Sequence, residues 1–171
     1  MILRPKAFAL VLALAAAPLS AIAAPQAPAV SIAKLSDLTV PDRPYDESAN
    51  ADAAVAAALA EGKATHKRVM IDLGGNWCGD CRVLAGIMDL PEVHRYLAAH
   101  YVLVSIDVGR FNKNLQVPAR YGITKRLEGV PSVLIVDENG NLVNRDHISA
   151  LADARSMTPQ AIADWLAQWS E

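Results

Sequence analysis

The chain contains very few cysteines: among its 171 residues, only Cys78 and Cys81 carry a thiol. This excludes the dense disulfide framework that holds together many small exported domains. Only two residues separate the two cysteines, whereas a disulfide that stabilises a fold usually closes a longer loop. The spacing therefore favours thiol–disulfide chemistry over a structural cross-link, which is the alternative interpretation.

Aromatic residues are also scarce, and the net charge of the chain is small. Phe, Trp and Tyr make up 5% of the chain, the formal net charge is −2, and no run of basic residues occurs. Without a basic stretch interleaved with aromatic residues, the sequence has no surface typical of nucleic-acid binding, and we expect no nucleic-acid partner. We find no internal repeat, and the length suits one domain with some additional segments.

The sequence contains no cluster with the spacing of a metal site. The histidines are scattered, and no pair of them has zinc-finger spacing; they are His66, His94, His100 and His147. A site built from two cysteines and two histidines is therefore not predicted, and we assign no metal ligand. Copper binding is kept as an alternative, because soft thiolates bind Cu(I).

Residues 1–23 resemble a secretory signal peptide. Arg4 and Lys6 form a basic start, residues 7–17 are apolar, and small residues allow cleavage after Ala23. An uncleaved membrane anchor is the alternative, but the apolar stretch is short for a membrane span and is followed by Pro18. We therefore expect export, and the compact remaining chain suggests the bacterial periplasm. Residues 24–47 are rich in proline and predict a linker or an N-terminal arm, in which residues 30–35 form either an edge strand or a disordered leader.

The remainder, residues 48–171, alternates between helical and strand patterns. We predict a helix over 48–61 capped by Gly62, and a further helix that begins at Asp89 and Pro91 and runs to Ala99. The other predicted helices cover residues 78–88, 115–121 and 158 onward, and the predicted strands are 69–73, 101–107, 129–136 and 142–147. An Asn-Gly turn at 139–140 joins the last two strands as a hairpin. The order predicts an α/β fold in three layers with a mixed sheet.

Both cysteines follow the predicted apolar strand 69–73, at the start of the next predicted helix. Free backbone N–H groups and the positive end of the helix dipole stabilise a thiolate at such a position and lower its pKa. Cys78 comes first and is the candidate nucleophile. Cys81 follows one helical turn later, close enough to form a disulfide.

The sequence Trp77-Cys78-Gly79-Asp80-Cys81 resembles the active-site motif of the thioredoxin family, Trp-Cys-Gly-Pro-Cys. Two more features match: Asp72 lies six residues before Cys78, and Gly129-Val130-Pro131-Ser132 is similar to the family's cis-proline loop. The resemblance covers the chain from about residue 50 onward. It implies a thioredoxin-like three-layer α/β/α sandwich with a central mixed sheet.

The resemblance also implies roles for these residues. Cys78 attacks a partner's disulfide, Cys81 resolves the mixed disulfide, and Asp72 accepts the proton of Cys81. Trp77, Val130 and a cis Pro131 contact the partner, and Pro131 keeps metal ions from the sulfurs. Many family members pair the buried acid with a lysine on the neighbouring strand, and this sequence has no lysine there.

Asp80 occupies the position of the motif's proline. We expect its carboxylate to be exposed to solvent and to raise the pKa of the cysteines modestly. This would disfavour the thiolate and make the protein a reductant rather than a strong oxidant.

The sequence thus predicts a periplasmic thiol–disulfide oxidoreductase without an organic cofactor. We expect protein thiols and disulfides as partners, a membrane thiol relay as electron donor, and a monomer. The alternatives are a disulfide isomerase, a copper-binding or copper-chaperone module on the same fold, and a redox-silent binding protein.

Overall fold

A three-stranded sheet forms the centre of the protein. The computed structural model describes residues 26–170, so the predicted signal peptide lies outside the described residues. Strand β1 (Arg68–Gly74) is central, with β2 (Tyr101–Asp107) parallel on one side and β3 (Ser132–Val136) antiparallel on the other. Parallel strands need a long crossover, which here contains two helices.

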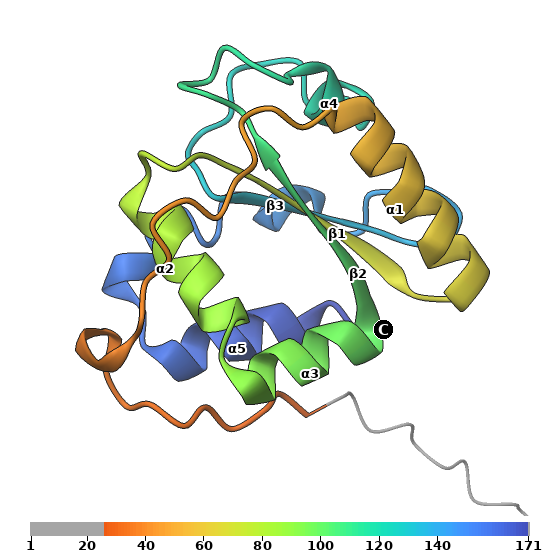
Figure 1. Ribbon diagram of the computed structural model, residues 1–171. Helices are drawn as coiled ribbons and strands as arrows, with labels where there is room; N and C mark the ends of the chain where they lie inside the picture. The colour runs from red at the N-terminus through yellow and green to blue at the C-terminus, as the bar shows by residue number, and fades with distance from the viewer. Residues whose placement is uncertain (1–25, 171) are drawn as a thin grey trace, which may run out of the picture.

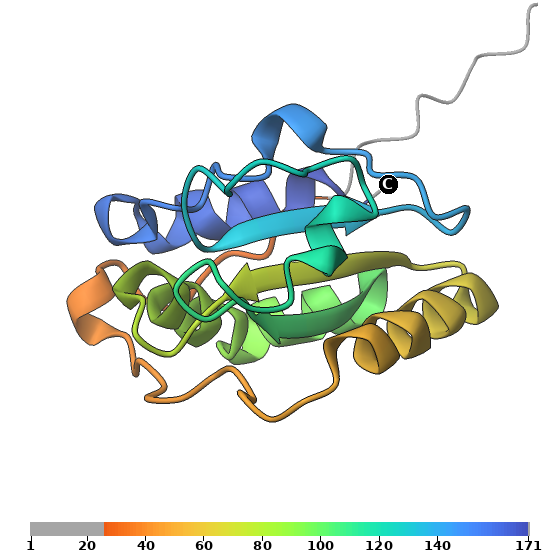
Figure 2. The ribbon, with the colours of Figure 1, turned by 90° about the horizontal axis from the view of Figure 1, so that it is seen from above.

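Helices cover both faces of the sheet (Figure 1). Helix α1 (Ala51–Thr65) and the short α4 (Gln116–Ala119) lie on one face, and α2 (Gly79–Met88), α3 (Pro91–His100) and α5 (Pro159–Gln168) lie on the other. The view from above looks onto the sheet and shows β1 between β3 and β2 (Figure 2). The predicted α/β sandwich is confirmed.

The central strand packs against both helical layers. Val69, Ile71 and Leu73 pack in the cluster that contains α1, while Met70 packs in the cluster that contains α2, α3 and α5. Successive side chains of a strand point to opposite faces, so a strand covered on both faces is apolar throughout. This explains why residues 69–73 are all hydrophobic except for the buried Asp72.

The predicted return strand 142–147 is wrong. The turn forms as expected, with the Asp137 amide donating to the Asn141 carbonyl over 2.9 Å and Gly140 at φ +86°. Beyond it, only one bridge joins Leu142 to Val136. The buried side-chain amide of Asn144 contacts β3 instead. Its oxygen accepts from the Ile135 N–H and its nitrogen donates to the Val133 carbonyl, each over 2.8 Å. The Asn144 side chain therefore shares the edge of β3 with two backbone hydrogen bonds, from the Val143 N–H to the Ile135 carbonyl and from the Val133 N–H to the Ile148 carbonyl. The sheet is mixed because β3 is antiparallel to β1.

Helix ends differ from the prediction at two places. Gly62 lies inside α1, which ends at Thr65 with His66 in the left-handed conformation. A Cβ on Gly62 would lie 2.7 Å from Val69 Cγ2, so close packing rather than capping requires this glycine. Asp89 lies at the C-terminal end of α2 and does not cap α3. Helix α3 begins with Pro91, and Leu90 before it makes no side-chain capping hydrogen bond. Thr158 does cap α5, accepting from the Ala161 N–H over 3.1 Å.

The segment before α1 forms an arm along the helical layer, including a 3₁₀ turn at Leu35–Asp37 (Figure 1). It is neither the edge strand nor the disordered leader considered above. Its apolar side chains pack on the α2, α3 and α5 cluster; they are Val30, Ile32, Leu35, Leu38 and Val40. The arm then crosses past α2 to reach α1 at the other face. Within residues 26–170, no helix combines the length and the apolar character needed to span a membrane.

Candidate active site

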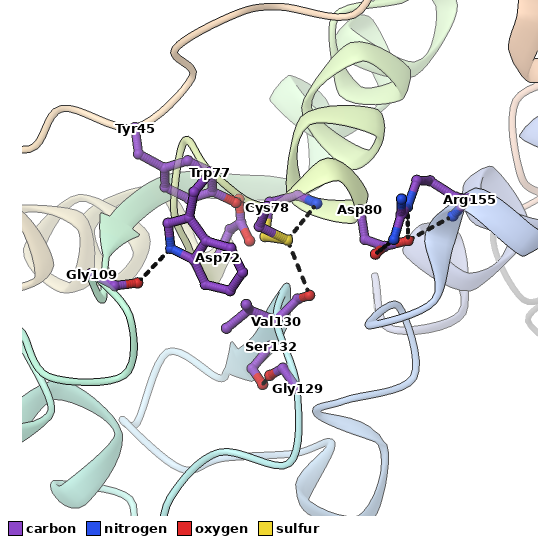
Figure 3. The surroundings of a disulfide bond; sticks show 11 residues. Tyr45, Asp72, Trp77, Cys78, Asp80, Gly109, Gly129, Val130, Ser132 and Arg155 are labelled. Atoms are coloured by element: carbon purple, nitrogen blue, oxygen red, sulfur yellow. Dashed lines mark hydrogen bonds and ion pairs between the residues drawn. A yellow bond between two sulfur atoms is a disulfide. The ribbon is translucent and has the colours of Figure 1, made fainter.

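Cys78 caps the N-terminus of α2. A turn follows β1, in which the Cys78 N–H donates to the Gly75 carbonyl over 3.0 Å, and the helix begins at Gly79. Cys78 forms a disulfide with Cys81, and the Cys81 N–H donates to Cys78 Sγ over 3.1 Å (Figure 3). After reduction, this N–H and the helix dipole would stabilise a Cys78 thiolate.

The proline loop lies directly against the outer sulfur. The Val130–Pro131 peptide bond is cis, as expected from the resemblance, and Cys78 Sγ is 3.3 Å from the Val130 carbonyl oxygen. Ser132 Oγ supports this turn by donating to the Gly129 carbonyl over 2.7 Å. The fold thus brings together two segments more than fifty positions apart, as Figure 3 shows.

The two cysteines differ in their access to a partner. Cys78 is 5% exposed and Cys81 is fully buried. A partner can therefore reach only the Cys78 sulfur, while Cys81 reacts from inside the protein. This asymmetry fits the roles of nucleophile and resolving cysteine that the sequence predicts.

Trp77 forms part of the surface around Cys78. Its side chain is 43% exposed, and its indole Nε1 donates to the Gly109 carbonyl over 2.7 Å. Phe111 meets it edge-on at 6.1 Å between ring centroids. The ring is therefore held in one orientation with part of its apolar surface exposed, and its contact with a partner stays a prediction.

Asp72 lies buried in β1 beneath this turn. Burial raises the pKa of its carboxyl to about 7, against the opposing effect of a 2.7 Å hydrogen bond that Oδ2 accepts from Tyr45. Within residues 26–170, Oδ1 has no hydrogen-bond partner. The residue beside it on β2 is Ser105, so no lysine occupies the paired position. A carboxyl that titrates near neutral pH can accept and release a proton during exchange.

Tyr45 belongs to this site, and the sequence analysis missed it. Its side chain is 2% exposed, and a Cβ on Gly74 would meet both the Tyr45 hydroxyl and Cys81 Sγ, the latter at 3.0 Å. Asn76, in the turn before Cys78, holds the Tyr45 backbone with two hydrogen bonds of 2.9 and 3.0 Å. Burial and the Asp72 charge raise the pKa of Tyr45 well above its usual value, so the hydroxyl stays protonated as a donor. The only signal in the sequence was a lone tyrosine after a proline in the arm.

The expected exposure of Asp80 is wrong. Asp80 is 8% exposed and forms an ion pair with Arg155, which follows the loop after β3. Its carboxylate accepts from the Arg155 N–H at 2.9 Å, from Nε at 3.1 Å and from Nη2 at 3.0 Å (Figure 3). The guanidinium compensates the carboxylate charge, so Asp80 alone does not determine the electrostatics at the sulfurs. No local sequence pattern pointed to Arg155.

Within the part of the chain that the structure describes, no three His, Cys, Asp or Glu side chains gather closely enough to hold a metal ion. The copper alternative therefore rests on the two sulfurs alone.

The site combines a nucleophilic sulfur at a helix N-terminus, a buried resolving sulfur, and a nearby carboxyl that titrates near neutral pH. Together with the cis-proline loop, this arrangement supports thiol–disulfide oxidoreductase activity.

Several solved structures are similar to this chain. A disulphide isomerase from Xylella fastidiosa Temecula1 is 39% identical, with a TM-score of 0.70, over 75% of this chain and 97% of that chain. A protein of unknown function from Pseudomonas aeruginosa is 19% identical over 72% of this chain and 84% of that chain, with a TM-score of 0.39. A thioredoxin variant from Halobacterium salinarum is 18% identical over 67% and 95%, with a TM-score of 0.37. The last two are too distant to carry an argument.

No curated protein sequence matches the chain. A family model described as thioredoxin-like matches residues 50–138. That range includes both cysteines and the proline loop, whereas Tyr45 and Arg155 lie outside it. By this match and the 39% identity above, the chain belongs to the thioredoxin-like family.

Proposed function

We propose that this protein reduces disulfide bonds of partner proteins in the periplasm and is recharged by a membrane thiol relay, acting as a monomer. The observation that carries the exchange chemistry is Asp72, a buried carboxyl with a pKa of about 7 beneath the disulfide. It can take the proton of Cys81 in the resolving step of reduction and return it in the reverse reaction, so the direction is tested by the reduction potential. The periplasmic location rests on the signal-like residues 1–23.

The reaction begins at the outer sulfur. The Cys78 thiolate attacks one sulfur of the partner's disulfide, forming a mixed disulfide and releasing the partner's first thiolate. Asp72 then takes the proton of the Cys81 thiol, and the Cys81 thiolate attacks Cys78 Sγ. The partner's second thiolate leaves and is protonated, so two electrons have moved from the Cys78–Cys81 dithiol to the partner.

A disulfide isomerase is the second candidate, because the 39% identical relative bears that description. An isomerase uses the same attack by Cys78 but returns the partner's thiolate to the mixed disulfide. Cys81 then serves only to release trapped intermediates. The two functions share Cys78 and differ in their need for Cys81.

The test compares the wild type with Cys81→Ser in two assays. One assay follows reduction of a protein disulfide by the dithiol form, and the other follows reshuffling of a protein with scrambled disulfides. A reductase loses turnover in the first assay with Cys81→Ser, and its wild type reshuffles poorly. Reshuffling that survives Cys81→Ser at nearly the wild-type rate would favour the isomerase.

The reduction potential against glutathione decides the direction independently. A value near −270 mV, about that of cytosolic thioredoxin, supports a reductant that needs an electron supply. A value near −120 mV, about that of the strong periplasmic oxidant, would overturn the reductive direction. Stoichiometric copper in the purified protein, with no disulfide formed, would favour the metal-binding alternative.

A further inference from the structure

An open groove lies beside the site, between α4 and the segment before the proline loop. Its volume is about 380 Å³. We call it the Phe111 groove, after the side chain at its end nearest the disulfide; its apolar lining is Phe111, Leu115, Pro118, Ile123 and Leu127. Leu115 is 39% exposed, although leucine is usually buried. The groove therefore presents apolar surface to solvent.

A chain of aromatic contacts joins the groove to the reactive sulfur. Phe111 packs edge-on against Trp77, and Trp77 is the residue directly before Cys78. Trp77 and Phe111 therefore form a continuous aromatic surface between Cys78 and the groove, which a bound polypeptide could follow.

The backbone holds Phe111 in an uncommon conformation. Its φ of +65° lies in the left-handed region, which bulky residues rarely adopt. Such strain persists where the surroundings require it, and it is concentrated at sites that bind or react. Here the conformation places the Phe111 ring between Trp77 and Arg126.

The groove is flanked by cations without partners. The guanidinium of Arg126 lies 4.2 Å from the centre of the Phe111 ring, and that of Arg110 lies 4.8 Å from the Trp77 ring. Within residues 26–170, neither of them nor Lys125 forms an ion pair, whereas Arg120 nearby is bound to Asp52. A guanidinium stacked on a ring keeps its N–H edge free for a carboxylate.

We propose that the Phe111 groove docks an acidic, apolar segment of the disulfide-bearing partner protein. An apolar side chain of the segment enters the groove, and flanking Asp or Glu carboxylates bind Arg110 and Arg126. This inference rests on the proposed thiol–disulfide exchange and names the class of partner that the site selects. Charge complementarity and the unpaired guanidinium groups favour an acidic segment over a neutral or basic one.

The test uses three disulfide probes with the reduced protein. Two are synthetic peptides with one internal disulfide and one leucine, differing only in whether two flanking residues are Asp or Asn. The third is hydroxyethyl disulfide, which is small and uncharged. We expect kcat/KM for the acidic peptide to exceed that for the amide peptide by about tenfold, a difference of roughly 1.4 kcal/mol.

Charge reversal provides the matched variant. Arg126→Glu should remove the preference for the acidic peptide and favour a peptide with Lys at the same positions, a gain that a misfolded protein would not show. Arg95→Glu, on the exposed face of α3, makes the same change in net charge and should keep the wild-type ratio. Equal rates for the Asp and Asn peptides, or equal effects of the two variants, would overturn the inference.

The uncharged probe separates this inference from the function on which it rests. If the wild type reduces hydroxyethyl disulfide but does not distinguish the peptides, only the docking inference is wrong. If the wild type does not reduce hydroxyethyl disulfide, the oxidoreductase function fails and the docking inference fails with it.

Discussion

Tyr45 links the N-terminal arm to Asp72, the carboxyl that we propose as the base of the resolving step. Its hydroxyl donates to Asp72 Oδ2 over 2.7 Å in a site from which water is excluded. A hydrogen bond to the ionised form lowers a carboxyl pKa, while burial raises it. The pKa of about 7 is therefore a balance between burial, which raises it, and the Tyr45 and Ser105 hydroxyls, which lower it.

Tyr45→Phe should shift this balance. Without the hydroxyl, burial dominates further and the pKa of Asp72 rises, so Asp72 becomes a working base only at higher pH. A hydrogen bond to a charged group contributes roughly 1.5–3 kcal/mol, equivalent to about one to two pH units. The measurement is the pH profile of partner release from a preformed mixed disulfide at Cys78.

Tyr96→Phe is the control for that profile, because Tyr96 lies on α3 and its hydroxyl contacts Ser170, just after α5, at 2.8 Å. We expect its profile to match the wild type. A Tyr45→Phe profile that also matches would show that Tyr45 only packs and does not influence Asp72.

Asp80 and Arg155 form the second pair of residues that act together. Removing the guanidinium leaves a poorly solvated carboxylate beside the sulfurs, which disfavours a thiolate. Arg155→Met should therefore raise the pKa of Cys78, by about one unit at most because Arg155 itself is largely exposed and screened. Thiolate ultraviolet absorbance of the reduced protein measures this pKa.

The double variant tests the cause. Adding Asp80→Asn to Arg155→Met removes the uncompensated charge and should return the Cys78 pKa towards the wild-type value. If the double variant keeps the shift of Arg155→Met, the effect comes from a change in the loop and not from charge.

At the scale of elements, α2 both supports the cysteines and receives the arm. Its helix N-terminus faces the disulfide, and its side near the C-terminus packs under the arm around Leu38 and Thr39. Gly86 makes this close approach possible, because an added Cβ would lie 2.9 Å from the Thr39 carbonyl oxygen and 3.1 Å from Leu38 Cδ2. The arm is thereby fixed before it reaches Tyr45.

Gly86→Ala should therefore lower the free energy of unfolding. Alanine favours a helix by about 1 kcal/mol over glycine, but crowding of a packed contact costs roughly 1–3 kcal/mol. We expect a net loss of up to about 2 kcal/mol, together with faster amide hydrogen exchange in residues 38–45. Urea unfolding checks the first expectation. A gain in stability would show that the arm moves aside without cost.

At the scale of the whole molecule, the active site costs stability at neutral pH. The pKa of Asp72 is about 7 in the folded protein, against an ordinary value of 3.8. A carboxyl with a raised pKa favours the folded state while it is protonated, below about pH 4. That contribution is lost as the pH rises through 7.

Asp72→Asn should make the oxidised protein more stable than the wild type at pH 8, with the difference shrinking towards pH 4. Three pKa units correspond to an upper bound on the order of 4 kcal/mol. Urea unfolding at the two pH values measures it, and Asp89→Asn, at an exposed carboxyl, controls for the loss of one charge. A stability difference that does not change with pH would contradict a buried, titrating Asp72.

Local patterns in the sequence were enough to predict β1, α2, β2 and α5. The strands β1 and β2 have mostly apolar stretches, and the helices α2 and α5 have a helical period with a capping residue. These patterns act over a few neighbouring positions. The Cys78–Cys81 pair at a strand-to-helix junction is local in the same sense. The resemblance added Asp72 and the proline loop, and the structure places both at the disulfide.

Tertiary structure alone decided what completes the site. Tyr45 and Arg155 are separated from the cysteines by more than thirty and seventy positions, and their partners are single buried carboxylates. Asn144 replaces a predicted strand in the same way, through a side chain that reaches the backbone of β3. Such contacts depend on which distant segments fold together, because an isolated polar residue has no periodicity. The sequence by itself therefore determined the fold and the reacting sulfurs, and packing determined the groups that adjust their charge.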